Sequence, residues 1–140
     1  DAFESTVSTI IAIMLTVIIS FVGVSSAGIG TKANPMQDSR IDVVKSQQIF
    51  KDYTVTYGEC LDNKCTDPEW TIFSSSDKKK VVEFNGNVVY NNMNSSLKIQ
   101  FVYNDSDDYW ALSYMALNGT AMDSNGAALL INYLCSDYFN

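Results

Sequence analysis

The sequence contains no histidine among its 140 residues. Histidine is the commonest general base at neutral pH and the commonest side-chain ligand of metal ions. The three cysteines, Cys60, Cys65 and Cys135, include no Cys-x-x-Cys pair, so the usual ligand spacing of a zinc site is missing as well. We therefore predict that the chain is not an enzyme, has no catalytic residues, and holds neither a metal nor a cofactor.

Positive charge is also scarce, because 9 Lys and Arg face 16 Asp and Glu and leave a net charge of −7. Nucleic acids attract basic surfaces, so we expect that the monomer binds no nucleic acid. The Asn-rich loops and the few cysteines suit an exported domain in which one disulfide persists. Three Asn-x-Ser/Thr triplets begin at Asn94, Asn104 and Asn118, which predicts that these residues lie on the surface.

Charge is missing altogether from residues 7–27, which are mainly Ile, Val, Leu, Met and Phe. At about 1.5 Å per residue, a helix of this length just spans a hydrocarbon core of about 30 Å. A secretory signal peptide would need basic residues before the run, whereas Asp1 and Glu4 precede it. A plain membrane anchor would carry cations on its cytoplasmic flank, whereas Lys32 and Arg40 lie after the run. Either the N-terminus faces outward or a basic leader has been removed.

The first 30 residues or so resemble the start of a mature type IV pilin. In that family a prepilin peptidase removes a basic leader, the first mature residue is usually Phe, and a Glu stands at the fifth position before an apolar helix. Here Glu4 is fourth and Phe3 is the nearest aromatic residue. The resemblance implies that Glu4 meets the α-amino group of a neighbouring subunit, with the carboxylate of Asp1 close by. The alternative is that Glu4 is a solvated flank, favourable at a helix N-terminus.

Small residues recur in this stretch at spacings of three or four, which places them on one stripe of a helix. Such stripes let neighbouring helices approach closely, although Ser and Thr are common in any membrane helix. The members are Ser5, Ser8, Ala12, Thr16, Ser20 and Gly23. We take Asp1, Phe3, Glu4, Ser8, Ala12 and Thr16 as the candidate assembly residues.

A hinge is expected after the apolar stretch, at Gly28, Gly30 and Pro35. Two glycines and a proline in so short a segment disfavour a continuous helix. The segment is either the counterpart of the locally melted stretch of pilins or a plain flexible linker. Residues 1–27, 28–39 and 40–140 are therefore predicted to be the apolar helix, the hinge and a globular head.

Residue patterns alone outline the head only coarsely. Residues 41–50 suit either a short helix or a strand, and residues 54–57 suit a strand followed by a hairpin tip between Cys60 and Cys65. Asn85-Gly86 predicts a tight turn. Ser124 is the predicted N-cap of a closing helix over residues 125–137.

Five motifs, in this order and spacing, resemble a small domain of secreted or membrane-anchored bacterial lipoproteins. They lie at residues 58–61 (GECL), 68–70 (PEW), 81–86 (VVEFNG), 98–102 (KIQFV) and 117–119 (LNG). The resemblance covers about residues 52–132 and implies no particular activity. It implies a helix over residues 56–66 and strands at 70–74, 80–84, 88–90, 97–103 and 110–117, the third of them absent or merged.

We accordingly predict an α+β fold, in which a long apolar N-terminal helix precedes a small head. The head is expected to hold an antiparallel sheet of about four strands with packed helices.

The cysteine pairing stays open between two arrangements. On one helix, Cys60 and Cys65 would be about 8–9 Å apart, too far for a disulfide, so one of them would pair with Cys135. The lipoprotein-type pattern places a large core aromatic at position 65 and so favours Cys65 with Cys135. In the hairpin interpretation Cys60 and Cys65 pair with each other.

Two charged segments have a plain and a sharper interpretation. Residues 104–108 (NDSDD) are either a solvated turn or a cation site, although they lack the Gly and the distal Glu of a calcium loop. Residues 78–80 (KKK) either protect a sheet edge from aggregation or dock acidic neighbours in a filament.

The function that these patterns favour is a structural subunit of an extracellular type IV pilus-like filament, serving adhesion, motility or DNA transfer. Its partners would be identical subunits in a helical polymer, and the inner membrane would hold it before assembly. The alternative is a monomeric membrane-anchored extracytoplasmic binding domain. The sequence identifies no surface receptor.

Overall fold

The computed structural model describes residues 38–139. The predicted apolar helix and most of the predicted hinge lie outside the described residues. The same is true of the candidate assembly and hinge residues: Asp1, Phe3, Glu4, Ser8, Ala12, Thr16, Gly28, Gly30 and Pro35. Those predictions therefore stay predictions.

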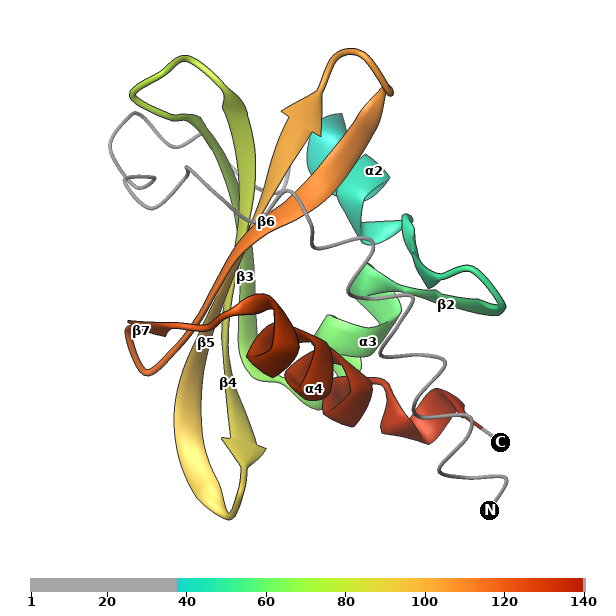
Figure 1. Ribbon diagram of the computed structural model, residues 1–140, viewed down its shortest axis with the longest axis vertical. Coiled ribbons are helices and arrows are strands. Elements are labelled where there is room, and N and C mark those ends of the chain that lie inside the picture. Colours follow the sequence, from blue (N-terminus) through green and yellow to red (C-terminus); the bar gives the residue numbers. More distant parts are fainter. Residues whose placement is uncertain (1–37, 140) are drawn as a thin grey trace.

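A five-stranded antiparallel sheet forms one layer of the described region (Figure 1). Each strand pairs with the next along the chain: β3 (Thr66–Ser74), β4 (Lys80–Tyr90), β5 (Met93–Asn104), β6 (Tyr109–Leu117) and β7 (Thr120–Ala121). A separate two-stranded sheet joins β1 (Gln48–Phe50) to β2 (Tyr53–Thr56). Residues 41–50 thus hold both of the elements that their pattern suggested, a helix and then a strand.

The helices lie together on one side of the large sheet (Figure 1). They are α2 (Ser39–Lys45), α3 (Tyr57–Lys64), α4 (Ser124–Leu134) and the short 3₁₀ helix η3 (Ser136–Tyr138). Within residues 38–139, no helix combines the length and the apolar character needed to cross a membrane.

The predicted fold class is wrong for the described residues. Strands make up 49% of them and helices 28%, so the region is rich in sheet. About four strands were expected in one sheet, and the structure has five strands in one sheet and two in another. The difference arises because the strands run longer than their apolar patterns and because β1 and β7 are too short to show a period, whereas β2 matches the strand suggested at residues 54–57.

The turn predicted at Asn85-Gly86 is also wrong. Both residues lie inside β4, where Gly86 pairs with Leu97, so the strands predicted at residues 80–84 and 88–90 are one. Glycine is needed there because a Cβ would lie 2.8 Å from Cζ of Phe84, whose ring covers the position. The actual turn is at Asn91 and Asn92, which have positive φ angles of 53° and 62°.

The hairpin tip suggested by the residue pattern between Cys60 and Cys65 is wrong, because α3 occupies these residues. The helix expected over residues 56–66 is confirmed as α3, capped by Thr56, whose Oγ1 accepts from the Glu59 backbone, while the Glu59 carboxylate accepts from the Thr56 backbone. The closing helix is confirmed as α4, but its N-cap is Asp123 rather than Ser124. The carboxylate of Asp123 accepts a hydrogen bond of 2.8 Å from the Gly126 backbone.

The main core lies between the sheet and the helices. Aromatic residues form its centre. The ring centroid of Phe101 is 4.8 Å from that of Tyr57 and 6.2 Å from that of Trp70. α4 adds Leu130, Ile131 and Leu134 to the same cluster. A second cluster of Phe73, Val81 and Val102 lies on the other face, since these residues pair across the strands and alternate with residues of the main core.

Candidate functional site

The cysteines meet where α3 lies against the C-terminal end of α4. Sγ of Cys60 is 2.8 Å from Sγ of Cys135, and both side chains are buried. The structure thus brings Cys60 to Cys135, whereas the lipoprotein-type pattern favoured Cys65. Cys65 is the residue after α3, and its Cβ lies against Gly86 of β4, since a Cβ on Gly86 would be 3.1 Å away.

Burial makes the thiols of Cys60 and Cys65 poor nucleophiles in the folded head. The hydrogen bond to Cys135, together with burial, raises the pKa of Cys60 far above the ordinary range of a thiol. Burial raises the pKa of Cys65 to about 12. A catalytic thiol needs a lowered pKa, so the environment of these residues is that of structural cysteines.

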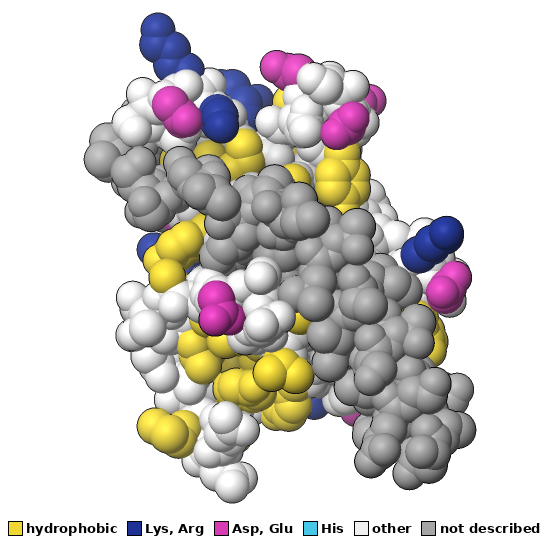
Figure 2. Space-filling model, viewed as in Figure 1, with side chains coloured by type: hydrophobic (Ala, Val, Ile, Leu, Met, Phe, Trp, Pro, Cys, Tyr) yellow, Lys and Arg dark blue, Asp and Glu magenta, His cyan; other side chains and the backbone are white. Residues whose placement is uncertain are grey.

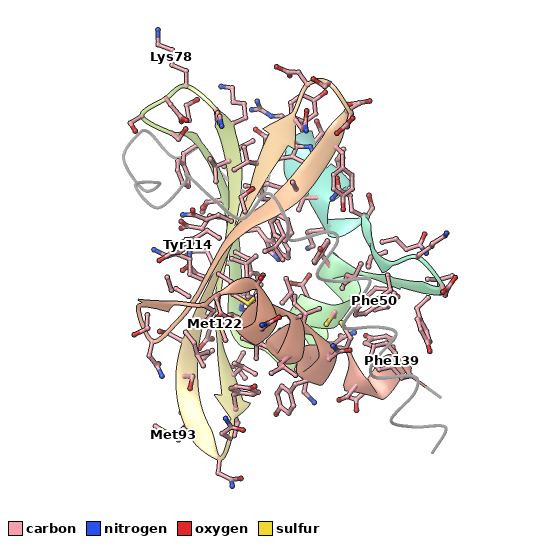
Figure 3. All side chains as sticks on the ribbon, viewed as in Figure 1. Phe50, Lys78, Met93, Tyr114, Met122 and Phe139 are labelled. Carbon is pink, nitrogen blue, oxygen red and sulfur yellow. The ribbon has the colours of Figure 1, made fainter. Side chains whose placement is uncertain are left out.

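The end of the chain is fastened beside the same pair. The hydroxyl of Tyr138 accepts a hydrogen bond of 2.7 Å from Asn63 and donates one of 3.2 Å to the backbone oxygen of Glu59. Phe139 packs edge-on against Phe50, with ring centroids 5.4 Å apart, and Figure 3 shows the two labelled rings together. These contacts hold the segment after Cys135 against α3 and β1.

The two charged segments are both turns at the same end of the sheet. Lys78 is at the tip of the β3–β4 turn and points outward (Figure 3). The predicted turn at residues 104–108 is confirmed, where Tyr103 donates a hydrogen bond of 2.6 Å to Asp108 and Asn104 one of 3.2 Å to Asp107. No cluster of three or more metal-ligating side chains occurs in residues 38–139.

A polar centre lies on the sheet face opposite the helices. Glu83, only 1% exposed, accepts hydrogen bonds of 2.8 Å from Asn85 and 2.9 Å from Gln100. Lys98 lies 4.0 Å from the same carboxylate. The two amides thus donate to different oxygens of the same side chain, Asn85 to Oε1 and Gln100 to Oε2.

An open groove of about 430 Å³ continues from this polar centre across four strands. Its polar lining comes from Asp67, Glu69, Asn85, Asn87, Ser96, Lys98 and Tyr114. Such a lining suits hydrogen bonding to a polar ligand. Sequence analysis missed the groove because its residues are far apart along the chain and carry no motif.

A third polar cluster joins α2, α3 and β3. The carboxylate of Asp62 pairs with Lys45 at 2.9 Å and accepts a hydrogen bond of 2.8 Å from the Trp70 indole. The ammonium group of Lys45 also lies 5.7 Å from the Trp70 ring centroid. Each group already has a partner, so the cluster serves to fix the three elements together.

Comparison with protein-family models, curated proteins and solved structures found no match. Function is therefore argued from the residues of this chain.

Proposed function

We propose that this protein is the structural subunit of an extracellular type IV pilus-like filament, which polymerises through its N-terminal apolar stretch and displays residues 38–139 as a head. The observation that carries the proposal is the uncharged run of residues 7–27 with Glu4 three positions before it. A lone carboxylate beside an apolar helix is costly in a filament core unless it is paired, and the α-amino group of a neighbouring subunit is a suitable partner.

The construction of the head supports this role. Among the described residues, its main cluster of buried side chains is drawn from the strands and helices of residues 38–139. The first described residue is Asp38, the N-cap of α2. The guanidinium of Arg40 and, to a smaller extent, the ammonium group of Lys80 at the start of β4 lower the pKa of Asp38. Asp38 therefore lies near the start of β4, beside the β3–β4 turn.

Charge at this end of the sheet offers a contact between copies. Figure 2 shows mainly Lys and Arg on one projection at the top and Asp and Glu on its neighbour, at the β3–β4 and β5–β6 turns. Subunits with a net charge of −7 repel one another when packed closely. Pairing the lysine turn of one copy with the acidic turn of the next would offset part of that repulsion, as the sharper interpretation of residues 78–80 expects.

The proposed partners are identical subunits, with the inner membrane as the site of the chain before assembly. The alternative is a monomeric membrane-anchored binding domain, and the polar groove beside Glu83 is the observation that favours it. Electron microscopy of material sheared from producing cells separates the two. Thin helical filaments of this chain support the first function, and isolated molecules in the membrane fraction support the second.

Glu4→Ala tests the role of the carboxylate. We expect filament yield to fall at least tenfold, while the head folds normally as judged by its thermal unfolding in detergent. Glu69→Gln is the control, since it neutralises an exposed acid of the head and leaves Glu4, and we expect it to retain filaments. Wild-type filament yield from Glu4→Ala would remove Glu4 from the assembly mechanism.

A further inference from the structure

We propose that Cys60 and Cys135 form a disulfide in the exported protein, joining α3 to α4, and that Cys65 keeps a free thiol. This inference is independent of filament assembly, because it needs only that the head reach an oxidising compartment.

The geometry selects this pair among the three possible ones. The two sulfur atoms are 2.8 Å apart, so a small rotation of the side chains brings them to the bond length of about 2.05 Å. Cys60 lies inside α3 and Cys135 is the C-cap of α4, two elements that already pack together. Cys65 follows the C-terminal end of α3. Its side chain lies against Gly86 of β4 rather than against Cys135.

The contacts around the pair hold both sulfurs in position. Asn63 and Glu59 of α3 hydrogen-bond Tyr138, three residues after Cys135. Lys64 adds an ion pair of 3.6 Å with Asp137. α3 is thus joined to the C-terminal segment by polar groups near the surface and by the two cysteines inside.

The bond forms by exchange with a thiol–disulfide oxidoreductase of the exported compartment. The thiolate of one cysteine attacks the disulfide of the oxidant and gives a mixed disulfide, releasing one thiol of the oxidant. The thiolate of the other cysteine then attacks the mixed disulfide, forms the Cys60–Cys135 bond and releases the second thiol. The head loses two electrons and two protons, and the oxidant gains them. Because both sulfurs are buried out of reach of an oxidant in the folded head, exchange takes place before α4 has packed against α3.

The bridge encloses most of the head. Its cysteines are 75 positions apart, and β3 to β7 lie between them. A disulfide that closes so long a loop constrains the unfolded chain strongly.

Peptide mapping tests the pairing directly, since Lys64 lies between Cys60 and Cys65. The full chain is exported, extracted in detergent, alkylated under denaturing conditions without reductant, and digested with trypsin. The cysteines then fall into three peptides: residues 52–64, 65–78 and 99–140. We expect the first and third linked, and the second alkylated.

Any other pattern overturns the proposal, namely peptide 65–78 linked to 99–140, peptide 65–78 linked to 52–64, or all three cysteines alkylated. Filaments with free thiols would refute the disulfide and leave the proposed function intact. A bridged chain that never forms filaments would do the reverse.

Serine variants give a second readout. Cys60→Ser should lower the Tm of the exported head by about 10 °C or more, as expected for the loss of a long-loop disulfide. Cys65→Ser is the matched control, and its Tm should respond to reductant as strongly as that of the wild type. If Cys60→Ser does not fold, the peptide map of the wild type still decides. A wild-type Tm that is unchanged by reductant would contradict the proposal.

Discussion

The two faces of the large sheet are made by alternate residues of the same strands, yet they are stabilised differently. Toward the helices, β4 and β5 present Phe84, Ile99 and Phe101, all fully buried in the main core. Away from the helices, the neighbouring positions are Glu83 and Gln100, also buried but hydrogen-bonded to each other. The burial of a residue alone therefore does not say how that residue contributes to the stability of the fold.

The two faces differ in what the loss of a buried side chain leaves behind. An apolar ring stabilises the fold through the area that it removes from water and through close contacts, so its loss leaves a cavity. A buried carboxylate is tolerated only because its acceptors are used, so its loss leaves donors without partners. Variants on neighbouring residues separate the two effects, and the buried Trp70 and Trp110 report unfolding by fluorescence.

The largest effect is expected at Phe101, whose ring contacts Tyr57 and Trp70 in the centre of the main core. Phe101→Ala should lower the free energy of unfolding by about 3–5 kcal/mol, measured by urea unfolding of the full chain in detergent. Val102 is the next residue along β5 and lies on the other face. Val102→Ala should cost about 2 kcal/mol, because fewer carbon atoms are lost than in Phe101→Ala. Equal costs would remove the energetic distinction between the faces.

An intermediate effect is expected at Glu83. Glu83→Gln keeps the shape of the side chain but replaces one acceptor oxygen by a donor that faces the amide of Asn85 or Gln100. We expect a loss of about 1–3 kcal/mol in the same measurement. The matched control is Glu69→Gln, which changes an exposed acid at the edge of the groove and should cost less than about 0.5 kcal/mol. A neutral Glu83→Gln would show that the polar centre does not stabilise the head.

The smallest loss of stability is expected at Asp38, which caps α2 and belongs to neither face of the sheet. Asp38→Ala should cost about 1 kcal/mol, and Asp38→Asn less, because Asn also caps helices. The guanidinium of Arg40 lowers the pKa of Asp38, so its contribution is present above the pKa of the unfolded chain and is lost as pH falls through the folded pKa.

Urea unfolding at several pH values checks this sign. The difference in stability between the wild type and Asp38→Asn should shrink as pH falls below about 4. If the stability difference grew as the pH fell, this would contradict the ion pair between Arg40 and Asp38.

Features that depend on neighbours along the chain were predictable from the sequence. The Thr56 and Glu59 capping box is a local signal that could have placed α3, although the residue pattern suggested a hairpin tip there and only the lipoprotein-type resemblance implied a helix. Alternation of apolar residues likewise puts Ile99 and Phe101 on one face of β5. Gly86 misled because Asn-Gly is usually a turn, and only the ring of Phe84 above it explains the glycine inside a strand. That explanation depends on how side chains pack in the folded structure, which a local sequence pattern does not show.

Features that join distant residues were out of reach. The choice between Cys60 and Cys65 depends on where α4 packs, and the groove beside Glu83 depends on the register of four strands. The extra strands were missed for a similar reason, since β1 and β7 have three and two residues and owe their structure to their partners.

α4 follows every strand in the chain and supplies the helix side of the core with Leu130, Ile131 and Leu134. During synthesis, the N-terminal residues emerge first and the core-facing side of the sheet stays open until α4 arrives. The head therefore completes its core only after nearly the whole described region has been synthesised. A chain interrupted before residue 124 would remain an unfinished sheet with exposed aromatic residues, open to proteolysis.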